Sequence, residues 1–115
     1  MQFMLIMMWE RGGPDADPAI FAEMGKFAGG LASQGKLKGG NPLKPEAEGA
    51  RIRLEAGDAR VTDGPFAETK EIVGGYFVIE CDSRAEAIEI AMKCPHAAVG
   101  PVEVREVIEV GPPAG

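Results

Sequence analysis

The hydrophobic and polar positions of the chain follow two periods, one of two residues and one of about 3.6, and these periods predict its elements. Residues 2–9 have the period of a strand, but they are apolar on both faces. One face holds Phe3, Leu5, Met7 and Trp9, and the other holds Met4, Ile6 and Met8. A strand of this kind needs a covering layer on each side.

Two segments show the helical period. The first covers residues 18–34, with Asp17 as its N-cap and Pro18 as its first residue. The second covers residues 83–94, opens with the capping box Ser83 and Glu86, and ends before Pro95. Their expected core faces are Ile20, Phe21, Met24, Phe27, Ala28 and Leu31 in the first helix, and Ala87, Ile88, Ala91 and Met92 in the second.

The remaining strands are expected over residues 50–56, 59–62, 75–81 and 102–110. In the first of these, Ile52 and Leu54 should point inward. Gly57-Asp58 has the order of a two-residue type II′ hairpin turn. Residues 35–49 are rich in glycine and proline and predict an irregular loop, with room for one short strand over residues 36–38.

This order of elements predicts an α+β fold, a ferredoxin-like antiparallel sheet with two helices. We expect a single domain over residues 1–110 and a disordered tail over residues 111–115. Two helices cover only one face of such a sheet. A second copy related by a two-fold axis would cover the other face, which predicts a homodimer arranged as a dimeric α+β barrel.

Composition narrows the class of protein. The chain has 115 residues, of which 45% are hydrophobic and 26% charged, as expected for one globular domain. Its net charge of -6 disfavours a direct nucleic-acid partner. Residues 1–9 have neither the basic flank of a signal peptide nor the length of a membrane span, so we expect a cytoplasmic protein without membrane association. Cys81 and Cys94 lack metal-ligand spacing and are expected to be buried thiols.

The densest cluster of turn-forming and charged residues lies at residues 61–71, Val-Thr-Asp-Gly-Pro-Phe-Ala-Glu-Thr-Lys-Glu. Asp-Gly-Pro predicts a turn, because glycine reaches positive φ freely and proline fixes φ. Asp63 on this turn could serve as a general acid or base, or it could accept hydrogen bonds from backbone N–H groups of its own turn.

His96 is the second catalytic candidate, since it is the only histidine and histidine is the side chain that ordinarily titrates near neutral pH. Alternatively, it could stabilise the C-terminal end of the preceding helix. Arg105 is expected mid-strand, where it could pair with Glu68, Glu71 or Asp63, or bind a carboxylate ligand.

Four more residues are candidates for ligand contact. Glu68 and Lys70 are charged residues on the same segment and could equally form a salt-bridged edge. Phe66 and Tyr76 would line a pocket or pack in the core. The sequence contains no zinc spacing, phosphate loop or dinucleotide fingerprint, so we expect no metal and no cofactor.

Residues 63–71 resemble the signature of the DGPF proteins, a branch of the YCII-related domain family. The resemblance extends over nearly the whole chain, through Gly-Gly-Asn-Pro-Leu-Lys-Pro at 39–45, Gly-Gly-Tyr-Phe at 74–77, Cys-Pro-His at 94–96 and Val-Glu-Val-Arg at 102–105. It departs at Glu106, where the family usually has proline. The resemblance also implies a dimeric α+β barrel.

The resemblance implies two functions of different classes. Relatives include a cofactor-free dehydrochlorinase acting on an aromatic ring, with an Asp/His acid–base pair. That role would fall here on Asp63 with His96 or Arg105 assisting, on a small anionic or aromatic metabolite, in lyase- or isomerase-like chemistry. DGPF proteins are also similar to domains fused or adjacent to sigma factors of the extracytoplasmic-function type. This implies a non-catalytic regulatory module with a transcription-related protein partner, and the residues leave both alternatives open.

Overall fold

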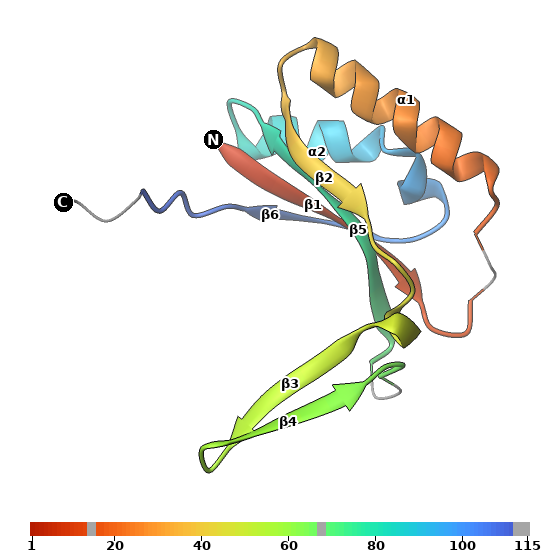
Figure 1. Cartoon of the computed structure of the whole chain (residues 1–115). Coiled ribbons are helices and arrows are strands. Elements are labelled where there is room, and N and C mark those ends of the chain that lie inside the picture. Colours follow the sequence, from red (N-terminus) through yellow and green to blue (C-terminus); the bar gives the residue numbers. More distant parts are fainter. Residues whose placement is uncertain (14–15, 67–68, 112–115) are drawn as a thin grey trace.

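A computed structural model describes residues 1–13, 16–66 and 69–111 of the chain. Its main body is an antiparallel four-stranded sheet in the order β2-β5-β1-β6, with both helices on one face (Figure 1). This confirms the ferredoxin-like α+β architecture. The elements are β1 (Gln2–Glu10), α1 (Ala19–Ser33), β2 (Leu37–Pro42), β5 (Glu71–Glu80), α2 (Arg84–Met92) and β6 (Val102–Glu106).

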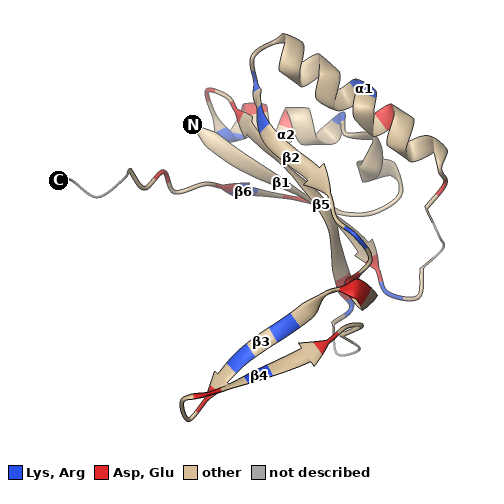
Figure 2. Cartoon of the chain, in the orientation of Figure 1, with Lys and Arg blue, Asp and Glu red and all other residues tan. Residues whose placement is uncertain are grey.

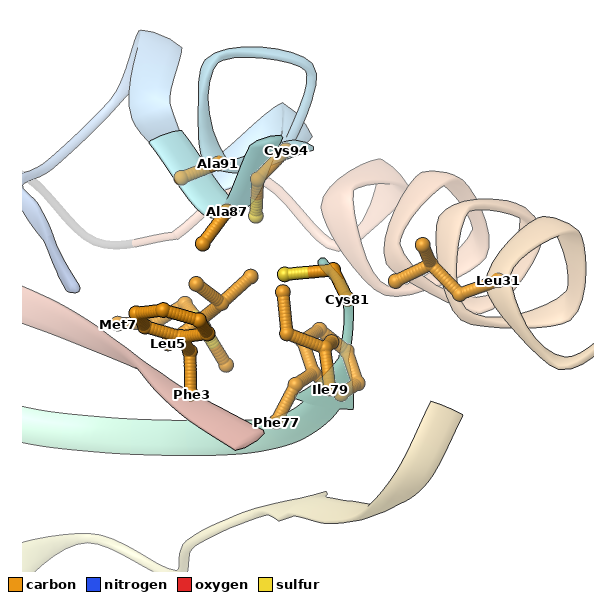
Figure 3. Packing of buried hydrophobic residues seen from close by; sticks show 10 residues of the cluster. All are labelled: Phe3, Leu5, Met7, Leu31, Phe77, Ile79, Cys81, Ala87, Ala91 and Cys94. Carbon is orange, nitrogen blue, oxygen red and sulfur yellow. The ribbon is translucent and has the colours of Figure 1, made fainter. Parts of the chain in front are cut away.

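The core lies between the sheet and the helices. Side chains of β1 and β5 point toward Ala87, Ala91 and Cys94 on one side and toward Leu31 of α1 on the other (Figure 3). The buried contributors from the two central strands and the residue that follows β5 are Phe3, Leu5, Met7, Phe77, Ile79 and Cys81. Cys81 and Cys94 are free, buried thiols, as predicted.

The opposite face of the sheet carries no helix (Figure 1). Because β1 pairs with β5 through Met4↔Val78 and Ile6↔Tyr76, these four side chains are neighbours on that face. Together with Met8 they form what we call the open face: Met4, Ile6, Met8, Tyr76 and Val78. The prediction that β1 is apolar on both sides is therefore confirmed, and on one of those sides no helix of the described residues covers it.

Both predicted helix starts are confirmed. The Asp17 carboxylate accepts a hydrogen bond from the Ala19 N–H (2.9 Å), and the Ser83 hydroxyl accepts one from the Glu86 N–H (3.1 Å). The expected core faces are wrong at Phe21 of α1, which is 63% exposed, and at Met92, which is exposed at the end of α2. In the described residues, neither helix has the length and apolar run needed to cross a bilayer.

The predicted loop at residues 35–49 is largely structured. β2 pairs with β5 at the edge of the sheet, through Asn41↔Tyr76 among others, and the 3-10 helix η1 (Glu46–Glu48) follows it. Edge strands tolerate glycine and proline, so β2 lacks the side-chain alternation that marks other strands. Gly40 adopts φ +144° and its backbone lies against Phe77, where a Cβ would come within 2.6 Å of the Phe77 ring.

The hairpin of β3 (Ala50–Glu55) and β4 (Asp58–Asp63) forms a separate two-stranded sheet that projects from the body (Figure 1). The prediction that Ile52 and Leu54 point inward is wrong, since their exposed fractions are 66% and 76%. Alternation along a strand identifies its apolar face, but not whether the chain itself provides a layer to cover it.

The turn of this hairpin also differs from the prediction. Ala56 and Gly57, rather than Gly57 and Asp58, connect the strands, and both have positive φ (50° and 86°). Positive φ at both central residues is typical of a type I′ turn and not of type II′. The alanine concealed the turn, because non-glycine residues rarely adopt such a conformation.

The last strand, β6, ends at Glu106, four residues before the predicted end. Val107 donates one further backbone hydrogen bond to Gln2 (2.9 Å), and β1 begins at Gln2, so no strand lies beside the residues that follow. Residues 112–115 of the predicted tail lie outside the described part of the chain.

Candidate functional site

A cavity of about 280 Å³ lies between α1 and the sheet, at the end of β1. Its lining is mainly apolar and includes Met7, Trp9, Phe21, Met24, Phe77 and His96. Such a space suits a small apolar or aromatic molecule, because burial of its rings would remove hydrophobic surface from water.

Backbone as well as side chains form the walls of the cavity. Gly40, Gly74 and Gly75 belong to the lining, from two neighbouring strands. A Cβ on Gly74 would lie 2.5 Å from Cδ1 of Trp9, so only glycine allows the indole to lie against β5. The glycines of the Gly-Gly-Tyr-Phe motif therefore shape the cavity.

His96 lies in the 3-10 helix η2 (Pro95–Ala98) and is only 3% exposed. Its Nε2 atom lies 2.7 Å from the carbonyl oxygen of Met8. Because a carbonyl only accepts hydrogen bonds, Nε2 carries a proton and donates it, and Nδ1 of the neutral ring keeps a lone pair. Nδ1 makes no hydrogen bond within the described residues. His96 thus binds the backbone of β1, and not the C-terminal end of α2 as the alternative expected.

Trp9 and His96 form a ring pair at the cavity wall. Their ring centroids are 4.5 Å apart and their planes are nearly perpendicular, at 83°. Edge-to-face aromatic pairs of this kind are worth about 1 kcal/mol beyond their buried area. The only tryptophan and the only histidine of the chain are therefore held together beside the cavity.

The segment 63–71 is anchored to β1 through Arg11. The Arg11 Nε donates to the Thr69 carbonyl and Nη2 to the Phe66 carbonyl, both at 2.6 Å, and Nη2 also donates to the Thr69 hydroxyl at 2.8 Å. Arg11 also forms an ion pair with Glu46 of η1, and this hydrogen-bonded guanidinium lowers the pKa of the Glu46 carboxyl. Sequence analysis missed Arg11, whose only signal is its place directly after an apolar strand.

Asp63 lies at the end of β4, opposite Ala50, and is exposed. It does not line the cavity. Its carboxylate makes no hydrogen bond or ion pair within residues 1–13, 16–66 and 69–111, so neither the expected turn-capping contact nor a contact with His96 or Arg105 is present there.

The neighbouring glycine has a different role from the predicted one. Gly64 does not adopt positive φ. A Cβ at this position would overlap the carbonyl group of Glu46, so glycine is required by close packing of two backbone segments. The same segment is held by Phe66, whose ring lies 4.2 Å from the guanidinium carbon of Arg51.

Arg105 lies on the face of the sheet opposite the helices, beside Met4. Its side chain is 70% exposed and pairs with Glu103 of the same strand at 3.8 Å. Within the described residues it forms no ion pair with Asp63 or Glu71, and the other expected partner, Glu68, lies outside them.

The other predicted contact residues are also outside the cavity lining. Tyr76 belongs to the open face. Lys70 is exposed, and its backbone carbonyl accepts a hydrogen bond from the Arg11 N–H (2.8 Å). Phe66 is held by Arg11 and Arg51, and Glu68 lies outside the described residues. Of the predicted site residues that the structure describes, His96 alone lines the cavity.

The described side chains include no group of three His, Cys, Asp or Glu residues placed to hold a metal ion. Burial raises the pKa of the Cys81 and Cys94 thiols, so neither is an activated nucleophile. Of the described side chains that line the cavity, His96 is the ionisable one.

Comparisons with known proteins are consistent with this fold. The family model of the YCII-related domain matches residues 1–111. An uncharacterised protein of Rhizobium meliloti (strain 1021) is 34% identical over 93 residues, which cover 79% of this chain and 75% of the relative. A solved structure of 5-chloro-2-hydroxyhydroquinone dehydrochlorinase from Burkholderia phenoliruptrix AC1100, in complex with 2,5-dihydroxybenzoquinone, is similar with a TM-score of 0.52, 15% identity and 96% coverage of both chains.

Proposed function

The chain belongs to the YCII-related domain family, and we propose that it binds a small aromatic metabolite in the cavity beside His96 and transfers a proton there. The observation that carries the proposal is the position of His96, an ionisable ring set into the wall of an otherwise largely apolar cavity. A histidine in such a place meets the geometric requirement for a general base, which is contact with a bound substrate.

The hydrogen bond to Met8 assigns the two ring nitrogens to different tasks. Nε2 donates to the Met8 carbonyl and fixes the orientation of the ring. Nδ1 is then the atom that accepts a proton from a phenol, an enol or an acidic C–H group of the ligand. The imidazolium formed in this step is stabilised by the same carbonyl, and returning the proton to another atom of the substrate would complete an isomerisation.

The choice of an aromatic ligand rests on the cavity and on the fold relative. The lining places Trp9, Phe21 and Phe77 around one space, where aromatic side chains favour a flat ring. The relative of the same fold acts on a chlorinated hydroxyhydroquinone and holds a dihydroxybenzoquinone. A lyase- or isomerase-like reaction on an oxygenated ring is therefore the chemistry that the site supports best.

The test uses the two single-copy residues as probes. Titration with 2,5-dihydroxybenzoquinone should quench Trp9 fluorescence and shift the ring ¹⁵N signal of His96, with Nδ1 moving more than Nε2. His96→Gln should retain the fold and lose proton transfer. Unchanged signals of both residues up to millimolar probe would contradict binding in this cavity.

An acid–base role for Asp63 is a separate prediction. Because Asp63 is exposed and outside the cavity lining, we assign the proton transfer to His96 and expect Asp63→Asn to retain ligand binding and turnover. A loss of turnover in Asp63→Asn at unchanged stability would instead show that Asp63 takes part in the reaction.

Membership of the DGPF branch and a transcription-related partner also stay predictions. Both rest on the resemblance of residues 63–71 to the DGPF signature.

The homodimer is part of the same proposal. The open face presents five adjacent side chains, all apolar except for the hydroxyl of Tyr76, on the side of the sheet that has no helix (Figure 1). Charged residues are absent from the middle of β1 and β5, whereas they band the hairpin (Figure 2). A second copy packing its sheet against this one would bury both open faces in a dimeric α+β barrel.

A further inference from the structure

Two segments project from the body of the protein at opposite ends of the sheet (Figure 1). The first is the β3–β4 hairpin, which we call the arm. The second is the continuation of β6 over residues 107–111, which we call the C-terminal segment. With them, the radius of gyration is 16.4 Å, against about 13 Å for a compact chain of this length. Each projecting segment exposes apolar side chains that the body does not cover.

The arm has one apolar and one charged face. Directly opposite residues share a face, and the pairs Ile52↔Val61 and Leu54↔Ala59 make one face apolar. All four side chains are exposed. A two-stranded hairpin is only marginally stable by itself in water, whereas a third strand adds backbone hydrogen bonds and further side-chain contacts along the apolar face.

The C-terminal segment has the pattern of a strand but no neighbour. Ile108 and Val110 alternate with Glu109, and both apolar side chains are 84% exposed. β6 stops pairing with β1 where β1 begins, at Gln2. The alternation of apolar and polar residues continues past this point. Among residues 1–13, 16–66 and 69–111, no backbone hydrogen bond is formed by this segment beyond Val107.

We propose that the C-terminal segment of one copy adds to the arm of the other copy as a third strand. This inference rests on the proposed homodimer. The arrangement would place Ile108 and Val110 on the same face as Ile52, Leu54 and Val61, because both strands alternate with the same period. One added strand thus pairs with one of the two free edges of the arm and brings Ile108 and Val110 into side-by-side contact with its apolar side chains.

Charge complementarity supports the same pairing. The polar face of the arm places Arg53 directly opposite Arg60, and like charges in that position destabilise a sheet. Glu55 pairs with Arg60 at 2.7 Å, but Arg53 has no ion pair within the described part of the chain. Glu109, on the face opposite to Ile108 and Val110, would lie beside the two arginines.

A chain cannot form this contact with its own arm. The arm leaves the sheet near the Glu10 end of β1, where Arg11 contacts Glu46, and the C-terminal segment leaves at the Gln2 end. These ends of a nine-residue strand lie about 26 Å apart at 3.3 Å per residue. Five extended residues span about 17 Å, which is less than this separation.

Two cysteine variants test the contact directly. The Leu54→Cys and Ile108→Cys proteins are mixed and oxidised with diamide, with the original chain and its two buried thiols as control. We expect disulfide-linked mixed dimers, and little linkage in either variant alone. Linked dimers of Leu54→Cys alone would show that arms contact arms and would overturn the proposal.

The same experiment separates this inference from the homodimer on which it rests. Sedimentation of the original chain as a dimer, with no cross-link in the mixture, would overturn the third strand and leave the sheet-to-sheet dimer intact. A monomer at micromolar concentration would overturn both.

A charge exchange provides a second measurement that does not disturb the fold. Arg53→Glu and Glu109→Arg should each weaken dimerisation about three- to tenfold, as expected for a partly exposed charge pair, and the double variant should recover most of the loss. Arg84→Glu, on the exposed surface of α2, is the matched control and should leave dimerisation unchanged. Additive losses in the double variant would contradict the pairing.

Discussion

The position of His96 depends on small residues from separate parts of the chain. Gly74 allows Trp9 to lie against β5, and Gly100 lies beside the Nε2 edge of the His96 ring. Neither glycine has positive φ, so close approach rather than backbone conformation requires both. The hydrogen bond from His96 to Met8 can form only because the chain at Gly100 leaves room for it.

Gly100→Ala should therefore displace His96. The new Cβ would meet the Met8 carbonyl and lie 2.9 Å from Nε2, at the hydrogen bond itself. We expect a loss of about 1–3 kcal/mol of unfolding free energy, typical of overpacking, and a larger relative loss of ligand binding. Thermal unfolding and Trp9 fluorescence titration measure the two effects. Gly111→Ala, where a Cβ meets no atom within 4 Å, is the control.

The Arg11–Glu46 ion pair gives the protein a pH-dependent contribution to stability. Because Arg11 lowers the pKa of the Glu46 carboxyl in the folded chain, the stabilisation is fully present above the unfolded-state pKa of about 4.3. It is lost as the pH falls through the lower folded-state pKa.

Glu46→Gln tests this contribution. The melting temperature of the original chain should exceed that of Glu46→Gln by a constant amount at pH 6–7, and the difference should shrink below about pH 4.3. Glu48→Gln, on the same 3-10 helix and exposed, is the control. A difference that stays the same down to pH 3 would show that the ion pair does not anchor the segment 63–71.

At the scale of elements, α1 forms one wall of the cavity and contributes Gly25 to it. A Cβ at Gly25 meets no atom within 4 Å, so a larger side chain can extend into the cavity without displacing the sheet. Glycine inside a helix is less favourable than leucine by about 0.8 kcal/mol. A substitution at Gly25 is therefore expected to stabilise the helix while it blocks the cavity, so the two effects can be measured separately.

Gly25→Leu should raise the unfolding free energy slightly and abolish ligand binding, because the leucine fills the space. Gly29→Leu is the matched control on the same helix, since Gly29 is exposed, meets nothing within 4 Å and does not line the cavity. It should gain the same stability and keep binding. Equal binding by both variants, measured by Trp9 fluorescence, would place the ligand elsewhere.

The sequence predicted the elements of this fold where an element's own pattern is sufficient. Both helices, their N-caps and the apolar strand at residues 2–9 follow from local periodicity and capping chemistry. Only the start of β2 was predicted, as a short strand over residues 36–38, because an edge strand with Gly39, Gly40 and Pro42 has no alternation to detect. The two hairpin strands were predicted in the right place, but Ile52 and Leu54 were expected to be buried, because the alternating pattern is the same whether the covering layer belongs to this chain or to another.

Prediction of the site was limited for a related reason. His96 was chosen because it is the only histidine, and it does line the cavity. Asp63 and Arg105 were chosen for their chemistry within short segments, but the cavity is assembled from β1, α1, β2 and β5, whose relative positions are tertiary information. The contact of Arg11 with the carbonyls of Phe66 and Thr69 spans more than fifty residues. Every residue has a backbone carbonyl, so the sequence does not show which of them accepts a hydrogen bond.

At the scale of the whole molecule, the two faces of the sheet have separate tasks. The face toward the helices holds the core and the cavity, and the open face is available for association (Figure 1). Met4, Ile6 and Met8 alternate along β1 with the buried Phe3, Leu5 and Met7, so successive side chains face opposite sides of the sheet. Changes on the open face should therefore affect association without damaging the core.

Ile6→Lys should convert the proposed dimer into a monomer. Ile6 pairs with Tyr76 near the centre of the open face, where a lysine would lose hydration if the second sheet packed over it. We expect dimerisation to weaken about 30-fold or more, corresponding to a central contact worth about 2 kcal/mol. Sedimentation velocity over a concentration series measures the change. Met92→Lys, an exposed apolar position on α2, is the control, and its association should not change.

If Ile6→Lys sediments as the original chain does, the open face is not the interface. If it becomes monomeric but still binds the probe at Trp9, each cavity is complete within one copy, and association serves stability and not the assembly of the site.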